Sequence, residues 1–220
     1  MSPTALTPAS ALLVLIFIGL APFVAVMVTS FTKIVVSLSL LRNAIGLQQT
    51  PPNLVINGLA LILTLYVMYP VGLDMQAAMA KQPPAASAQS DVDRIFASMN
   101  AAKEPLRAFL LKHASPRERA FFLRAAKRSL SPARAAQITD QDLLIVVPSF
   151  VVGELTAAFQ IGFLIFLPFL VIDLVIANIL LAMGMMMIPP TTVSLPFKLL
   201  LFVMVDGWVK ISHGLVLSYT

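Results

Sequence analysis

The sequence predicts an all-α integral membrane protein. Hydrophobic residues make up 59% of the 220 residues and charged residues only 11%, whereas soluble domains carry about 25% charged residues. The apolar residues also gather in runs close to the length of a bilayer-spanning helix. A soluble fold of this size would leave much of that apolar surface in water. We therefore expect membrane-embedded helical hairpins with a small helical insert.

The charged residues are concentrated in the middle of the chain. Eleven of the fifteen Lys and Arg residues lie within residues 81–134, and seven of the ten acids lie within residues 74–142. This distribution predicts three segments, which are apolar helices at 1–73, a polar helical insert at 74–142 and a helical hairpin at 143–220.

The first segment contains two apolar runs. Residues 11–28 are uncharged and just long enough for one span, and residues 30–41 continue the apolar pattern around Lys33. The proline-containing stretch at 47–53 indicates a turn. A second run of about 20 residues follows at 54–73, which is the length that a spanning helix needs.

The insert begins with a predicted linker at residues 81–90. Ser115 is typical of a helix N-cap, Pro116 suits the first helical position, and Glu118 completes a capping box. The same start chemistry recurs at residues 131–132. The insert is therefore expected to be a small folded helical module.

The last segment is predicted to be a helical hairpin. Residues 143–188 are too long for one span, so we expect an approach segment followed by a long helix with a kink at Pro168. Pro189 and Pro190 end that helix sharply. Residues 193–217 are then the final helix of the chain.

Charge also predicts the orientation. The first ten residues carry no Lys or Arg, so the first apolar run is expected to be retained and not to be a cleaved signal. Lys33 and Arg42 follow that run, which places them in the cytoplasm by the positive-inside rule. The insert then lies on the periplasmic side, since segments longer than about 60 residues cross largely regardless of charge.

Ionisable residues inside apolar helices cost roughly 2.5–3.5 kcal/mol each at a helix centre on insertion scales. Such residues must face protein, water or a partner charge. They act either as a proton or ion relay or as salt bridges at subunit interfaces, and the scattered acids favour the interface. The residues concerned are Lys33, Glu154, Asp173, Lys198, Asp206 and Lys210.

The spacing of these residues in the sequence predicts how two pairs of them meet. Asp206 and Lys210 are four residues apart, so they can pair on one helix face. Asp173 and Lys198 lie at different distances from the turn at Pro189, so we expect them to pair between subunits.

No signature of enzymatic chemistry is present. The chain has no Cys, and neither His113 nor His213 has a second ligand at helical spacing. A phosphate loop, a metal-binding His pair and a nucleophile elbow are absent. Acids interleave with the bases and aromatic residues are few, which argues against nucleic-acid binding. We predict no enzyme activity, no cofactor and no metal site.

Four of the eleven Met residues gather before the proline pair, at Met183, Met185, Met186 and Met187. One interpretation is apolar filling at a lipid-facing helix end. The other is a ring of soft, adaptable side chains from several subunits, which would close around an irregular polypeptide.

Three stretches are similar to one known family. They are PFVAVMVTSFTKIVVSLSLLRNAIGLQQTPPN at 22–53, PSFVVGELTAAFQIGFLIFLPFLVIDLVIANILLAMGMMMIPP at 148–190 and SLPFKLLLFVMVDGW at 194–208. The chain thereby resembles the FliP/SctR family, the export-apparatus subunits of flagellar and virulence-associated type III secretion systems. It departs from the family pattern at Ser149, where Ala is usual, and the lack of an evident cleavable signal favours the virulence-type branch.

The resemblance implies a function that composition does not. The chain would be one copy in a homo-oligomer, a pentamer, in the bacterial inner membrane at the base of the secretion apparatus. Its partners would be subunits of the SctS, SctT and SctU families, secreted unfolded polypeptides and membrane lipid. Met185, Met186 and Met187 would form a methionine gasket that narrows the pore, within a cone of helices.

A proton-coupled transporter of small solutes is the rival hypothesis, with Glu154 and Asp173 as proton carriers. Transporters often contain duplicated halves with broken helices at the membrane midplane. No such duplication is visible in this sequence, which favours the export subunit.

Overall fold

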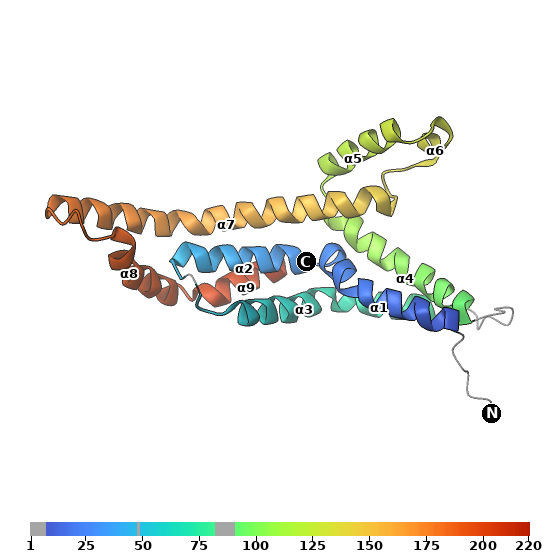
Figure 1. Cartoon of the computed structure of the whole chain (residues 1–220), viewed down its shortest axis with the longest axis horizontal. Helices are drawn as coiled ribbons and strands as arrows, with labels where there is room; N and C mark the ends of the chain where they lie inside the picture. Colours follow the sequence, from blue (N-terminus) through green and yellow to red (C-terminus); the bar gives the residue numbers. More distant parts are fainter. Residues whose placement is uncertain (1–7, 48, 82–90) are drawn as a thin grey trace, which may run out of the picture. The chain divides into compact units, whose positions relative to one another are not determined.

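The structure is a computed structural model that describes residues 8–47, 49–81 and 91–220 (Figure 1). Within these ranges the chain forms nine α-helices and no β-strand. The helices are α1 (Pro8–Val28), α2 (Phe31–Ile45), α3 (Asn53–Ala80), α4 (Asp91–His113), α5 (Pro116–Ser129), α6 (Pro132–Gln137), α7 (Leu143–Ala182), α8 (Pro190–Met204) and α9 (Gly207–Leu217).

The predicted class, an all-α membrane protein, is confirmed. Helices α3 and α7 are each long and apolar enough to cross a membrane, and the number rises to four if two bent helix pairs each count as one span. The turn predicted at 47–53 lies between α2 and α3. Except for Lys81, the predicted linker at 81–90 falls outside the described residues.

Proline does not divide the third segment as predicted. Helix α7 runs from Leu143 to Ala182, so the expected separate approach segment before Gly153 is wrong, and both Pro148 and Pro168 lie inside the helix. A proline in a helix interior removes a backbone hydrogen bond. Membrane helices tolerate this because neighbouring groups satisfy the freed carbonyl.

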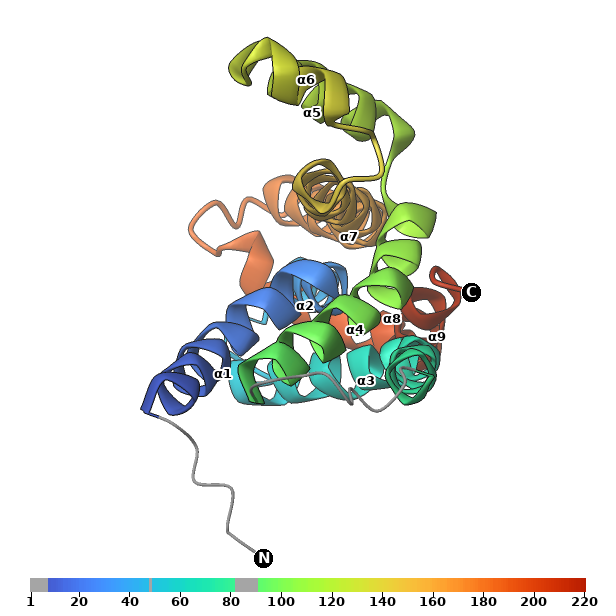
Figure 2. The same cartoon turned by 90° about the vertical axis from the view of Figure 1, so that its right-hand side faces the viewer.

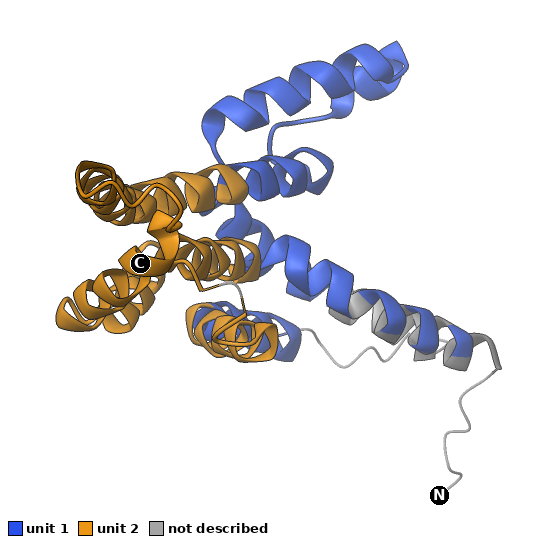
Figure 3. Ribbon diagram, turned by 60° about the vertical axis from the view of Figure 1, so that its left-hand side comes forward, with its two compact units in different colours: residues 1–29, 68–153 blue, residues 30–67, 154–220 orange. Residues whose placement is uncertain are grey.

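The chain divides into two compact units (Figure 3). Unit 1 comprises residues 1–29 and 68–153, and unit 2 comprises residues 30–67 and 154–220. Each unit therefore combines segments that are distant in the sequence. The division at 73 and 142 that charge predicts stays a prediction.

Unit 1 contains the helices of the polar insert. Helices α5 and α6 lie side by side in both views (Figures 1 and 2), and α1 packs against α4. Phe109 and Phe150 meet edge to face, with ring centroids 5.8 Å apart. Helix α5 begins at Pro116 after the N-cap Ser115, as predicted, although the Ser115 hydroxyl makes no capping hydrogen bond.

Unit 2 is organised around α2. One face of α2 packs in two apolar clusters, the first with Ile56 and Ala60 of α3 and Leu215 of α9. The second cluster joins α2 to Phe169 of α7 and Phe202 of α8. The buried residues of α2 recur at the spacing of one helix face. They are Lys33, Ile34, Ser37, Leu38, Leu41, Ala44 and Ile45.

The final helix predicted at 193–217 is interrupted. Helix α8 ends at Met204, α9 begins at Gly207, and the two are bent by 59°. Asp206, between them, has a left-handed backbone with φ of 52°. A Cβ atom on Gly207 would collide with the Phe202 ring, so the close approach at this bend requires glycine.

Candidate functional site

A buried charge cluster lies at the start of α2. The Lys33 ammonium is 3.7 Å from Glu154 Oε1 of α7, and both residues are about 95% buried, with exposures of 5% and 4%. The Tyr219 hydroxyl donates a hydrogen bond to Glu154 Oε2. The Tyr219 ring also lies beneath Lys33, whose Nζ is 3.8 Å from the ring centroid.

This arrangement satisfies both charges within one chain. Glu154 Oε2 accepts a hydrogen bond and Oε1 forms the ion pair, whereas Lys33 has a carboxylate and an aromatic face as partners. A buried ion pair is tolerated when its remaining hydrogen-bonding groups are satisfied, and a cation over an aromatic ring gains further attraction. The cluster ties three segments together, which are α2, α7 and the residues after α9.

A second charge cluster joins α7 to α8. Lys198 Nζ lies 2.6 Å from Asp173 Oδ2, and the Ser194 hydroxyl donates to Asp173 Oδ1 at 2.5 Å. Ser194 and Lys198 are buried on one face of α8, four residues apart. The expectation that Asp173 and Lys198 pair between subunits is therefore wrong, because they pair with each other inside the chain.

The width of the turn explains this correction. Asp173 and Lys198 lie at unequal distances when counted from Pro189, but α7 ends at Ala182 and α8 begins at Pro190. Asp173 is nine residues before the end of α7 (182 − 173), and Lys198 is eight residues after the start of α8 (198 − 190). At 1.5 Å per residue the two lie about 13 and 12 Å from the turn, so they are level.

The turn at residues 183–189, named here the methionine turn, is built by glycine and proline. The Met185 N–H bonds the Leu180 carbonyl at 2.9 Å and the Gly184 N–H bonds the Leu181 carbonyl at 3.0 Å. These two bonds form a Schellman motif that ends α7, with Gly184 at φ of 74°. Pro190 then occupies the first position of α8, where its missing N–H is harmless.

The methionine turn presents its side chains to the outside of the chain. Gly184 redirects the backbone, so the Met residues leave the packed face of α7. Met185 is 43% exposed, Met186 is 79% exposed and Met187 is 98% exposed. Met183, at the end of α7, is 63% exposed. The turn is thus an apolar cluster without cover in one copy of the chain.

Asp206 and Lys210 do not form the predicted ion pair in the described structure. Asp206 lies at the break before α9, outside the helix, so the helical spacing of four no longer places its side chain beside that of Lys210. Its backbone carbonyl instead accepts the Lys210 N–H at 3.0 Å. Both side chains are exposed, and a role at a subunit interface remains a prediction.

The two His residues are not part of a cation site in the described ranges. His113 lies against Phe109, with ring centroids 4.8 Å apart, and His213 is exposed on α9. In the part of the chain that the structure describes, no group of three His, Cys, Asp or Glu residues is placed to hold a metal ion.

The sequence reasoning missed Tyr219 and Ser194 as partners of the buried acids. Tyr219 is 65 residues from Glu154 in the chain, and no local pattern connects them. Ser194 had a usable signal, because it lies one helical turn before Lys198 and shares its face.

Together these features define a class of protein. It is a helical, multi-pass membrane protein whose acids at 154 and 173 are paired with lysines and whose methionine turn is uncovered. The chain belongs to the FliP family, which it matches over residues 14–215.

Named relatives agree with this family. The chain is 53% identical to "Pathogenicity-related ORF2" of Xanthomonas campestris pv. glycines, over 94% of this chain and 95% of that protein. It is 50% identical to "Hypersensitivity response secretion protein HrcR" of Ralstonia nicotianae, over 96% and 97% of the two chains. It is also 50% identical to "Yop proteins translocation protein R" of Yersinia pestis, over 94% of each. The family places the chain among membrane components of protein secretion and not among enzymes.

Proposed function

We propose that the chain is the pore-forming subunit of a type III export gate, which conducts unfolded proteins across the bacterial inner membrane. The observation that carries this proposal is the methionine turn, where residues 185–187 expose 43%, 79% and 98% of their surface. Family membership and the names of the relatives support a role in secretion.

Several copies around a shared axis would bring their methionine turns together. An exposed apolar cluster of this kind marks an interaction surface. Met side chains are unbranched and polarisable, so a ring of them adapts to the varied shape of a passing polypeptide. In the absence of substrate the same side chains, at Met185, Met186 and Met187, close on one another as a gasket.

The assembly is proposed to be a pentamer of this chain with subunits of the SctS, SctT and SctU families. Its helices form a cone at the base of the secretion apparatus, and the polar insert lies on the periplasmic side. The exposed faces of α3 and α7 support this assembly, because residues such as Leu54 and Phe163 are 83% and 65% exposed in one chain. Lipid and neighbouring subunits are the partners that such faces accept.

The charge clusters favour the export subunit over a proton-coupled transporter. The two acids that would carry protons, Glu154 and Asp173, are each paired with a lysine. Each pair joins two segments of the chain, the first α2 to α7 and the second α7 to α8. Both pairs therefore fit a structural role better than a relay.

Replacing Met185, Met186 and Met187 together with Ala tests the gasket. We expect the co-expressed complex to assemble at its normal size on a native gel, and the closed gate to leak small ions. The matched control replaces Met27, Met79 and Met204, which are 48%, 40% and 74% exposed outside the turn. Ion permeability of membranes that contain each complex is the measurement, and equal permeability in the two variants would contradict the gasket.

A further inference from the structure

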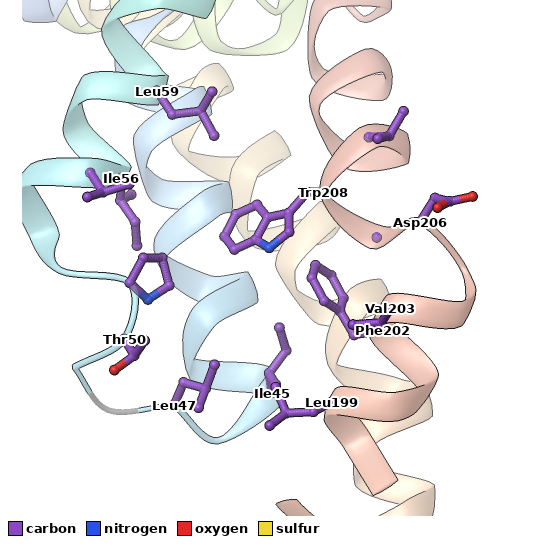
Figure 4. Close-up of a pocket in the computed structure, with 14 residues that line it drawn as sticks. Ile45, Leu47, Thr50, Ile56, Leu59, Leu199, Phe202, Val203, Asp206 and Trp208 are labelled. Carbon is purple, nitrogen blue, oxygen red and sulfur yellow. The ribbon is translucent and has the colours of Figure 1, made fainter. Parts of the chain in front are cut away.

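Unit 2 contains an apolar cavity of about 580 Å³. It is lined by the end of α2, by Leu47, Thr50 and Pro51 before α3, by the start of α3, and by α8 and α9 on either side of their bend (Figure 4). Trp208 lies at its centre and meets Phe202 edge to face, with ring centroids 5.5 Å apart. The volume falls within the range of small-molecule sites, about 300–1,000 Å³.

The lining offers a water molecule few hydrogen-bond partners. Apart from Thr50 and Asp206 the side chains that surround the cavity are those of apolar residues or glycine. A buried water needs two to four polar partners, and an apolar cavity stays dry but accepts apolar molecules. Figure 4 also shows the Asp206 carboxylate directed away from Trp208, so it leaves the centre of the cavity apolar.

Apolar residues beside the cavity are exposed in the single chain. Leu54 and Leu200, next to lining residues on α3 and α8, are 83% and 61% exposed. Helix α3 is apolar enough to cross a membrane. A bilayer around α3 would bring the chains of membrane lipids to the cavity, whose lining residues Val55 and Val203 are 56% and 71% exposed.

A cation lies next to the cavity wall. Arg42 Nη1 donates to the carbonyl of Pro51, a lining residue, at 3.3 Å, and to Asn53 Oδ1 at 2.6 Å. Its Nε is buried and has no hydrogen-bond partner in the described structure. Guanidinium groups recognise phosphate by charge and by their fork of N–H donors. An apolar cavity beside an arginine matches the two parts of a phospholipid.

We propose that this cavity binds one acyl chain of a membrane phospholipid, whose phosphate pairs with Arg42. The proposal goes beyond export, because it concerns how unit 2 is completed in the bilayer. Bound lipid stabilises the folded unit by mass action.

Trp208 is the single Trp of the chain, so its fluorescence reports on the cavity without engineering. The full chain is reconstituted in bilayers that contain phospholipid with brominated acyl chains, which quench tryptophan on contact. We expect a saturable loss of Trp208 fluorescence at low brominated fraction, in addition to the linear quenching by bulk lipid.

Two substitutions on one helix separate the bound chain from bulk lipid. Val203→Phe fills the cavity and should remove the saturable quenching, whereas Leu200→Phe, on the same helix but outside the lining, should retain it. Val209→Phe, a lining change on α9, is a second cavity-filling variant if Val203→Phe fails to fold. Arg42→Gln should require more brominated lipid for the same quenching.

The outcomes decide the proposal. If the wild type lacks saturable quenching, or if the cavity-filling and control variants quench alike, no acyl chain occupies the cavity. If Arg42→Gln leaves the titration unchanged, the phosphate contact is wrong. The assay involves no secretion, so its failure would leave the proposed export function standing, and a failed gasket would leave the lipid site standing.

Discussion

The buried charge cluster and the methionine turn belong to the same unit but differ in whether their side chains have partners within one chain. Lys33, Glu154 and Tyr219 satisfy one another inside a single chain. Met186 and Met187 are 79% and 98% exposed and have no cover. The first region is complete in one copy, whereas the second requires other molecules to cover its apolar surface.

The difference separates interactions that stabilise each subunit from interactions that need the assembly. A charge left alone in an apolar environment is costly, so Glu154 and Asp173 pair with lysines of their own chain. A thioether is uncharged, so its contacts with neighbouring molecules can form later, when the complex assembles. The charges thus stabilise the fold of each copy, and the methionine turn serves the complex.

Glu154→Gln should have the largest effect on stability. It leaves the Lys33 ammonium buried beside a neutral amide, and breaking a buried pair in this way costs about 3–5 kcal/mol. The chain itself should lose thermal stability in detergent, before any question of assembly arises. Adding Lys33→Met to the same chain should recover most of the loss, because the orphaned charge is gone.

The matched control for this change is an exposed pair. Arg119 Nη1 lies 2.9 Å from Asp140 Oδ2, and the Asp140 side chain is 50% exposed. Asp140→Asn should change stability by less than about 1 kcal/mol, as for surface salt bridges in general. Equal melting shifts for the two variants would mean that the Glu154 cluster is not buried as described.

Tyr219→Phe should have an intermediate effect. The variant keeps the ring under Lys33 but loses the hydrogen bond to Glu154. Hydrogen bonds to charged groups contribute about 1.5–3 kcal/mol. Tyr66→Phe, at a residue that is 69% exposed, is the control and should be nearly neutral in the same melting assay. A neutral Tyr219→Phe would exclude the hydroxyl from the cluster.

Gly184→Ala and Gly58→Ala should have small effects of opposite sign. No atom lies within 4 Å of a Cβ at either position, but Gly184 has a φ of 74°. Alanine in the left-handed region costs roughly 1–2 kcal/mol, whereas alanine in the interior of α3 gains roughly 0.5–1 kcal/mol over glycine. Melting curves that shift in the same direction would argue against the Schellman end of α7.

Local chemistry predicted much of this fold. The apolar runs predicted the membrane helices, and Ser115 and Pro116 marked the start of α5. The proline pair was predicted to end the long helix, but α7 already ends at Ala182 and Pro190 instead begins α8. Gly184 carried an unused signal for the turn, since glycine commonly ends helices. Using it would have placed Asp173 and Lys198 level and predicted their contact.

Other features depend on contacts that are distant in the sequence. The break at Asp206 is a partial exception, because the pair Asp206-Gly207 is a local turn signal that the prediction of one helix at 193–217 did not use, and only the packing of the Phe202 ring against Gly207 was not predictable. Tyr219 reaches Glu154 only after α7 and α9 have packed against α2. The prolines predicted interruptions, but α7 continues through them, because helix propensity measured in water is a poor guide in an apolar environment.

Disulfide cross-linking at position 187 shows whether the methionine turns of neighbouring copies meet. The chain has no Cys, so Met187→Cys introduces a single thiol in the methionine turn. If the turns of neighbouring copies meet around an axis, mild oxidation in membranes should yield a disulfide-linked dimer, since bridged Cα atoms must lie within about 7 Å. Val203, which is exposed on α8, is the control position, and Val203→Cys chains should form no disulfide-linked dimer. If the Met187→Cys chains of the assembled complex form no disulfide-linked dimer, the gasket is contradicted.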